Sequence, residues 1–167
     1  MEAIDDFRLG MQRLASGVSV VTTASADGVR YGLTATSVFS LSLYPPSLVV
    51  GINKETRLGE VIPSVPAFAV SVLGAGHRHV AEAFAGRVSG LRGSARFAYG
   101  SWRYSTEGVP ILDDSPASFT CKVGDIIERS THLLVVGDVA NVYIGRKENS
   151  LLVYSARRFS SISCAAV

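Results

Sequence analysis

The chain has 167 residues, 47% of them hydrophobic and 18% charged, and its formal net charge is +2. A chain of this length and apolar content is expected to form one domain, residues 1–167, with a substantial core. Scattered basic residues argue against nucleic acid as a partner, and the lack of any run near the roughly 20 apolar residues that span a bilayer argues against membrane insertion.

The N-terminal residues predict a helix. Asp5 or Asp6 can cap it, and Phe7, Met11 and Leu14 recur at the spacing of one helical face. The opening residues are acidic where a signal peptide is basic, and no apolar segment follows them. We therefore expect a cytoplasmic protein.

The next segments predict strands joined by tight turns. Residues 18–23 are mostly β-branched, which is typical of a buried strand, and Asp27-Gly28 is a hairpin signal. Pro45-Pro46 then divides residues 31–54 into two strands. Within them, one set of residues suits a buried sheet: Leu33, Val38, Leu41, Leu43, Leu48, Val49, Val50 and Ile52.

The rest of the chain predicts short helices and longer strands. Helices are expected over 56–61 and over 77–86, where Gly86 ends the second one. Residues 87–108 are rich in Gly, Ser and Arg and predict a long, partly mobile connection. Further strands are expected over 67–73, 117–129, 131–146 and 151–162. The pattern predicts a mainly β fold with an antiparallel closed sheet, not alternating βαβ units.

Several familiar motifs are absent or incomplete. "GAGHRH" (74–79) follows a strand, but His79 occupies the place of the third glycine of a dinucleotide fingerprint. The histidines and cysteines lack the spacing of metal ligands, so no metal is expected. Cys121 and Cys164 form no disulfide framework and are expected to be reduced thiols.

A row of hydroxyl and amide side chains lies among the apolar residues of the segment 31–54. One interpretation is an edge strand with a solvated polar face. The other is a phosphate or polyol site, because Asn53, Lys54 and Thr56 directly precede a predicted helix start. The residues alone leave both interpretations open.

Taken together, the motifs resemble those of the short-chain flavin reductases, the reductase components of two-component flavin-dependent monooxygenases. The resemblance covers almost the whole chain, and the matching pieces occur in the family's order. They are Phe7, Met11, "ASGV" (15–18), "VVTT" (20–23), Asp27-Gly28, "GLTATS" (32–37), "SLSLYPP" (40–46), Asn53, "AEAFAG" (81–86), "VPIL" (109–112), "THLLVVGDV" (131–139) and "LLVY" (151–154).

This resemblance implies an FMN-binding split β-barrel, a Greek-key antiparallel barrel with a few short flanking helices, that forms a homodimer. It implies FMN or FAD as flavin and NADH or NADPH as hydride donor. His132 would lie near the nicotinamide as the catalytic residue. The implied flavin-binding residues are Thr34, Ala35, Thr36, Ser37, Ser40, Asn53, Lys54, Thr56, Phe84, Ala85, Gly86, Tyr154 and Arg158.

The chain departs from the family pattern in two places. Thr56 stands where the family commonly has serine, which keeps the hydroxyl, and residues 87–105 match poorly. Contacts from that segment are therefore not implied by the resemblance.

The implied activity is hydride transfer from a nicotinamide to flavin, which supplies reduced flavin to a monooxygenase. Because the cofactor carries this chemistry, no side-chain nucleophile is needed. One alternative is a non-catalytic flavin carrier on the same barrel. A second is an oxidase of a pyridoxine-type phosphate, which would need a denser basic cluster. For His132, the alternative role is that of a structural hairpin histidine.

Overall fold

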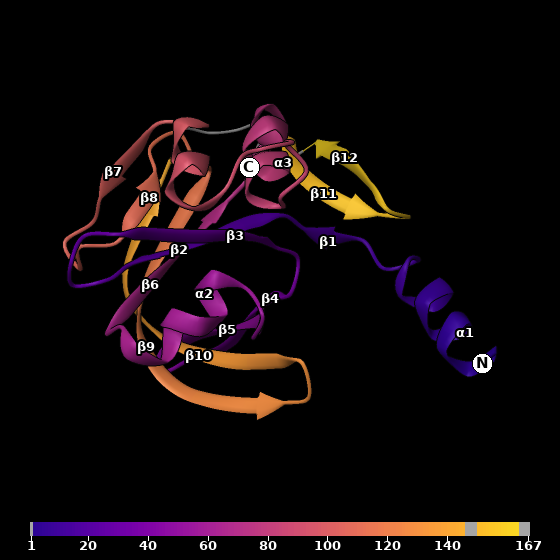
Figure 1. Cartoon of the computed structure of the whole chain (residues 1–167), viewed down its shortest axis with the longest axis horizontal. Coiled ribbons are helices and arrows are strands. Elements are labelled where there is room, and N and C mark those ends of the chain that lie inside the picture. The colour runs from indigo at the N-terminus through magenta and orange to yellow at the C-terminus, as the bar shows by residue number, and fades with distance from the viewer. Residues whose placement is uncertain (1, 146–149, 164–167) are drawn as a thin grey trace.

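A computed structural model of the chain describes residues 2–145 and 150–163, in which antiparallel strands predominate (Figure 1). The helices are α1 (Glu2–Met11), α2 (Arg57–Val61) and α3 (Arg78–Phe84), with 3-10 turns η1 (Ile62–Ser64), η2 (Ala75–His77) and η3 (Gly93–Ala98). The strands are β1 (Ser16–Gly17), β2 (Ser19–Ala24), β3 (Arg30–Ala35), β4 (Val38–Leu43), β5 (Pro46–Asn53), β6 (Ala67–Val72), β7 (Trp102–Tyr104), β8 (Pro110–Leu112), β9 (Ala117–Arg129), β10 (His132–Ile144), β11 (Ser150–Ser155) and β12 (Arg158–Ser163).

The main sheet has seven strands in the order β3-β2-β6-β9-β10-β5-β4, and every neighbouring pair in it is antiparallel. This confirms the predicted antiparallel sheet. The Asp27-Gly28 turn joins β2 to β3, and Gly28 has the positive φ of 82° that such a turn requires. The strands predicted around Pro45-Pro46 are β4 and β5, which form a hairpin.

The barrel has a gap between two strands that are consecutive in the chain. β3 and β4 lie at opposite edges of the sheet, and only residues 36 and 37 connect them. The sheet curls so that the edges approach, and the amide of Gly51 donates to the Ser37 carbonyl at 2.9 Å. Helix α2 contacts both β3 and β5 at this gap (Figure 1). Residues from both strands and a helix therefore border the gap.

The two largest of three apolar clusters among the described residues hold the barrel together. The first fills its interior, where Val50, Ile52 and Phe68 are fully buried. The second packs α3 against the outside of β2, with Val20 and Phe84 among its buried members. Burial also raises the pKa of Cys121 to about 12, so this residue stays a neutral, unreactive thiol. Cys164 lies outside the described residues.

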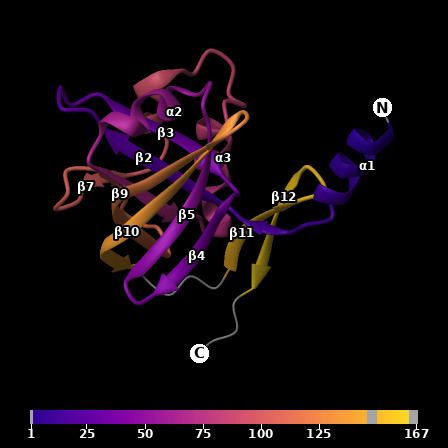
Figure 2. The same ribbon diagram turned by 90° about the horizontal axis from the view of Figure 1, so that it is seen from below.

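The first helix differs from its prediction. It begins at Glu2, so neither Asp5 nor Asp6 caps it, and it stands apart from the barrel beyond the β11–β12 hairpin (Figure 2). Within the described residues its apolar side chains are not packed into a core, and Phe7 is 66% exposed. Met11 and Leu14 are exposed as well. The periodicity therefore correctly predicts a helix, but its apolar face is not buried against the barrel.

For residues 87–108 the sequence predicts a long, partly mobile connection, but part of this segment has regular structure and is packed. It contains η3 and β7, and the side chain of Phe97 is buried. Its ring packs edge-on against Phe84, with centroids 5.0 Å apart, and against Trp102 at 5.0 Å. Three widely spaced aromatic residues anchor the segment, which a local composition of Gly, Ser and Arg does not reveal.

Strand β4 also corrects an expectation. Leu41 and Leu43, predicted to be buried, are exposed, and so is Phe39. The pairing of β4 with β5 shifts register between Ser40 and Ser42, so Leu41 lies in a β-bulge where regular alternation of side chains is interrupted. Because β4 is an edge strand, it has a neighbouring strand on one side only.

Candidate functional site

A cavity of about 670 Å³ opens at the gap in the barrel. Its walls come from β3 and the turn that follows it, from the start of α2, from the end of α3, from η3 and from the first residue of β10. This volume suits a cofactor-sized ligand. The lining residues are Val29, Arg30, Tyr31, Gly32, Leu33, Thr34, Ala35, Thr36, Ser37, Gly51, Asn53, Glu55, Thr56, Arg57, Leu58, Phe84, Ala85, Gly93, Ser94, Arg96 and His132.

Nine of the predicted site residues meet in this cavity, although they come from five separate segments of the chain. They are Thr34, Ala35, Thr36, Ser37, Asn53, Thr56, Phe84, Ala85 and His132. The pairing of β10 with β5 sets His132 directly opposite Asn53, which explains how two distant residues reach one wall. Sheet register therefore brings together what the linear sequence separates.

Two hydroxyl groups in the polar row position the backbone. The hydroxyl of Thr34 donates to the Ala81 carbonyl at 2.7 Å and so ties β3 to α3. The hydroxyl of Ser37 donates to the Gly51 carbonyl at 3.1 Å across the gap. Thr36 is exposed and has no such partner within the described residues. The row thus contributes both to the scaffold and to the polar surface of the cavity.

The loop before α2 is built by its own side chains. Thr56 caps the helix: its hydroxyl accepts from the Gly59 amide at 3.0 Å and donates to the Asn53 carbonyl at 2.7 Å. The side-chain oxygen of Asn53 accepts from the Glu55 amide at 2.9 Å. These bonds fix the loop as a rigid rim, while the side-chain amide nitrogen of Asn53 remains for a ligand.

The opposite wall is aromatic. Phe84 ends α3, is almost fully buried, and packs on Phe97 and Trp102. A Cβ atom on Gly32 would lie 2.6 Å from the Phe84 ring, so only glycine admits the ring at this point of β3. Ala85 follows Phe84 in the lining. This part of the lining is therefore apolar and closely packed.

His132 lies at the rim. It begins β10, its side chain is exposed, and its Nδ1 lies 2.9 Å from the Thr131 hydroxyl. Its other ring nitrogen, Nε2, has no hydrogen-bond partner within the described residues. The imidazole can therefore hydrogen-bond a ligand at the mouth of the cavity.

Five predicted site residues are not part of the cavity lining: Ser40, Lys54, Gly86, Tyr154 and Arg158. The ammonium of Lys54 forms an ion pair with Glu128. The Tyr154 hydroxyl accepts from Arg87 at 2.9 Å, away from β3. Ser40 and Arg158 are exposed on β4 and β12. Contacts between these five residues and flavin stay predictions.

The cavity also contains residues that sequence reasoning missed, above all Arg30, Arg57 and Arg96. Alternation along β3 could have indicated Arg30, because it shares a strand face with Gly32 and Thr34. Arg96 lies in the segment that matches the family poorly, and its position depends on long-range packing. No local pattern marks it.

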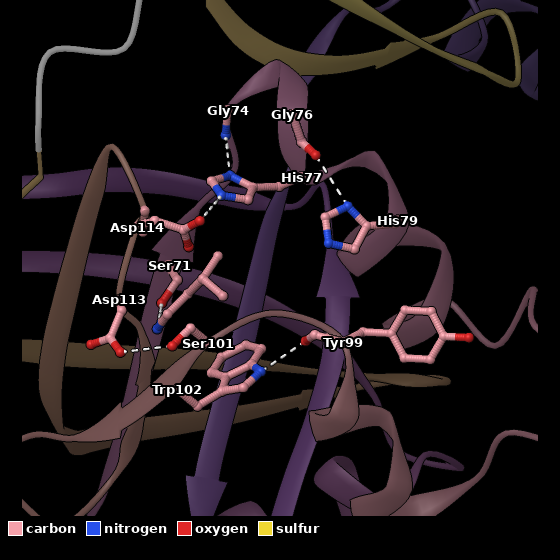
Figure 3. A network of polar contacts seen from close by, with 12 residues as sticks. Ser71, Gly74, Gly76, His77, His79, Tyr99, Ser101, Trp102, Asp113 and Asp114 are labelled. Atoms are coloured by element: carbon pink, nitrogen blue, oxygen red, sulfur yellow. Dashed lines mark hydrogen bonds and ion pairs between the residues drawn. The ribbon is translucent and has the colours of Figure 1, made fainter.

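The remaining motif residues form a structural network near η2 (Figure 3). His77 accepts from the Gly74 amide at 3.0 Å and faces Asp114 at 3.2 Å, whereas His79 turns to the Gly76 carbonyl at 3.1 Å. Within residues 2–145 and 150–163, no cluster of three His, Cys, Asp or Glu could hold a metal ion. No helix in these ranges is long and apolar enough to cross a membrane.

The family pattern described as "Flavin reductase like domain" matches residues 11–163. The chain therefore belongs to the flavin reductase-like domain family, and its fold is the split barrel of that family. A relative from Streptomyces pristinaespiralis, NADH:riboflavin 5'-phosphate oxidoreductase, is 36% identical over 92% of this chain and 85% of its own length.

Solved structures agree with this assignment. NADH:FAD oxidoreductase SgcE6 of Streptomyces globisporus C-1027, solved with NAD and FAD fragments, has a TM-score of 0.86 and 26% identity, covering 99% of this chain and 96% of its own. BorF, the flavin reductase component of a bacterial two-component tryptophan halogenase, also has a TM-score of 0.86 and 26% identity. It covers 97% of this chain and 99% of its own.

Proposed function

We propose that the protein is an NAD(P)H:flavin oxidoreductase, which transfers a hydride from NADH or NADPH to FMN or FAD. The observation that carries this proposal is the cavity at the barrel gap, where nine residues implied by the family resemblance lie together. Family membership and relatives whose names state NADH and a flavin support it.

The residues of the cavity fit a flavin. The isoalloxazine ring is flat and largely apolar with polar edges, and the ribityl chain is a polyol. The cavity offers Leu33, Ala35 and Phe84 as apolar surface, and Thr36 and Asn53 as hydrogen-bonding groups. A few convergent polar groups in an otherwise apolar wall are typical of cofactor sites.

Bound flavin supplies the ring that accepts the hydride. The protein's part is to orient two ligands and to stabilise negative charge on the reduced ring. The Thr36 hydroxyl and backbone N–H groups of residues 34–37 that face the cavity can donate to that charge. The hydroxyls of Thr34 and Ser37 already donate to the Ala81 and Gly51 carbonyls, so their part is to hold this backbone in place. Asn53 and Thr56 line the same cavity and would contact the polyol chain.

His132 would orient the hydride donor. An imidazole at the cavity rim can hydrogen-bond the carboxamide of a nicotinamide without transferring a proton. Its exposed Nε2 is suited to this role. The alternative is a purely structural hairpin histidine, and kinetics of a variant distinguish the two.

Steady-state oxidation of NADH or NADPH with added FMN or FAD tests the proposed function. We expect flavin-dependent turnover in which flavin behaves as an exchangeable substrate. A protein that binds flavin and leaves NADH unoxidised would be the carrier, and full-rate turnover without any flavin would overturn the proposal. Oxidation of a pyridoxine-type phosphate would favour the oxidase alternative.

The proposal extends to the protein's setting. We infer one domain over residues 1–167, a homodimer, and a flavin-dependent monooxygenase that receives reduced flavin. The exposed apolar residues of α1 and β4 support the dimer, and the role printed for BorF supports a flavin-using partner enzyme. A cytoplasmic location is consistent with the free thiol of Cys121, because reducing compartments maintain thiols.

A further inference from the structure

Two arginine side chains line the same end of the cavity without a counter-charge. Arg30 comes from β3 and Arg96 from η3, and both are half-buried. Neither forms an ion pair with any carboxylate of the described residues. In contrast, Arg57, which also lines the cavity, pairs with Glu60 at 3.1 Å. The two unpaired guanidinium groups therefore distinguish this end from the rest of the cavity.

The protein fixes the position of Arg96 while leaving its charge unneutralised. Its Nη1 donates to the Phe84 carbonyl at 3.3 Å and, more weakly, to the Gly32 carbonyl at 3.5 Å. Its Nε is buried and has no hydrogen-bond partner among the described residues. A buried donor on a cationic group costs free energy unless a partner satisfies it. Backbone carbonyls therefore orient this guanidinium, and no carboxylate of the described residues neutralises it.

Arg30 is oriented by an aromatic ring from the same segment. Its guanidinium carbon lies 4.5 Å from the centroid of Phe97, the residue that follows Arg96. Phe97 is itself fixed between Phe84 and Trp102. The stacking fixes the plane of the Arg30 guanidinium but supplies no negative charge equal to a carboxylate.

Like charges at one end of a partly enclosed cavity repel each other, and an anion between them relieves both. Phosphate suits two guanidinium groups best, because their planar forks bind its oxygens in pairs. Gly93 and Ser94 line the same end, and no atom lies within 4 Å of a Cβ position on Gly93. The site therefore has both charge and room for a phosphate.

We propose that Arg30 and Arg96 form a subsite for a phosphate or diphosphate group of a ligand in this cavity. The inference rests on the proposed function for the nature of that ligand. Two sources share this chemistry: the phosphate of the flavin nucleotide and the diphosphate of the nicotinamide dinucleotide. The experiment below distinguishes them.

Isothermal titration calorimetry of the full chain with FMN, riboflavin and ADP-ribose tests the subsite without relying on turnover. We expect Arg96→Gln to weaken binding of a phosphate-bearing ligand by about 10- to 100-fold, the range for loss of a charged hydrogen-bond partner. Riboflavin, which has no phosphate, should bind as before. Weaker binding of FMN would assign the subsite to the flavin phosphate. Weaker binding of ADP-ribose would assign it to the diphosphate of the dinucleotide.

Further variants separate binding from packing. Arg30→Gln removes no bond to a backbone carbonyl, so it should fold normally and show the same selective loss. Arg92→Gln is the matched control, because Arg92 is exposed in the same segment and does not line the cavity. An equal loss of affinity for riboflavin and FMN, or no loss of affinity for any ligand, would contradict the proposed phosphate subsite. Selective loss in a protein that fails to oxidise NADH would overturn the proposed function alone.

Discussion

Two residues at the cavity rim have a backbone held by the sheet and a side chain that can contact a ligand. His132 is paired through β10 with Asn53, so the backbone of each is fixed by the sheet. Their side chains remain at the surface of the cavity. A residue placed in this way can select the orientation of a ligand with little loss of its own conformational entropy.

We expect His132→Ala to raise the KM for NADH or lower kcat/KM by about 10- to 100-fold, equivalent to roughly 1.4–2.7 kcal/mol of transition-state stabilisation. The physical reason is loss of the hydrogen bond that orients the carboxamide. Flavin affinity, measured by fluorescence quenching, should change far less. A collapse of flavin binding with unchanged NADH parameters would assign His132 to the flavin pocket instead.

Glu107 does not line the cavity. Its carboxylate makes the free energy of unfolding depend on pH in the acid range. Burial disfavours its charge, but surrounding donors outweigh this effect and lower its pKa from 4.5 to about 2. Because the folded-state pKa is depressed, its stabilising contribution is present above about pH 4.5 and is lost as the pH falls toward 2. Thr106 and Asn141 donate hydrogen bonds to its carboxylate, and the hydroxyls of Thr120 and Ser105 also lower its pKa.

The melting temperature of Glu107→Gln should therefore fall less steeply than that of the wild type between pH 5 and pH 2. Thermal unfolding followed by circular dichroism measures both curves. Other carboxylates titrate in both proteins, so the difference isolates Glu107. Parallel curves would show that this carboxylate does not contribute to the acid sensitivity.

Among the elements, the contact between β3 and α3 determines the shape of the cavity. The Thr34 hydroxyl binds the Ala81 carbonyl, Arg96 binds the Phe84 carbonyl, and Gly32 admits the Phe84 ring. The Thr34–Ala81 bond joins residues 47 apart in the chain, and Arg96 also reaches the Gly32 carbonyl, 64 residues away. The aromatic wall is thus a product of tertiary packing.

We expect Gly32→Ala to destabilise the fold by about 1–3 kcal/mol, because the new methyl group would overlap the Phe84 ring. Chemical denaturation monitored by fluorescence measures this change in the free energy of unfolding. Gly17→Ala is the control, since no atom lies within 4 Å of a Cβ position on Gly17. Equal stabilities of the two variants would show that Phe84 moves away without cost.

The elements differ in how far their sequence predicts them. Strand β2, the Asp27-Gly28 turn and helix α2 follow from β-branched residues, turn chemistry and the Thr56 cap, all of which act locally. The burial of Phe97 depends on rings from other segments, so composition alone misled. The exposure of Leu41 follows from the edge position of β4, which becomes known only with the sheet order.

The candidate site likewise contains residues that the sequence predicts and residues that it does not. Thr36 and Asn53 could be identified because their residue types and order match the family. Arg30 could have been indicated only by alternation along β3, and Arg96 could not be identified, because its position depends on the Gly32 carbonyl of a distant segment. Lys54 has the residue type expected of a phosphate ligand, but its ion pair with Glu128 is a long-range feature of the fold.

At the scale of the whole molecule, the protomer leaves much apolar surface exposed. Phe39, Leu41 and Leu43 are exposed on β4, and Phe7 and Met11 are exposed on α1. Both surfaces belong to elements at the boundary of the barrel, an edge strand and a helix that stands apart (Figure 2). Such surface favours association with a second copy of the chain.

Sedimentation velocity at micromolar concentration should therefore give a species of twice the chain mass of 17.7 kDa. We expect Leu41→Asp to shift the protein toward monomer, because a charge would be desolvated in the interface. Tyr104→Asp serves as control, since Tyr104 is equally exposed but lies on β7. A wild-type monomer under these conditions would contradict the homodimer.

The gap in the barrel has a thermodynamic consequence. The cavity draws its walls from β3, at one edge of the curled sheet, and from β5, next to the other edge, so unfolding of either side would remove the binding site. A ligand bound there therefore stabilises the folded state. At a free ligand concentration 100 times its Kd, the free energy of unfolding rises by about 2.7 kcal/mol. FMN should accordingly raise the melting temperature in proportion to the logarithm of its concentration. In a cell, the concentration of free flavin would then affect both the fraction of the protein that is folded and its turnover rate.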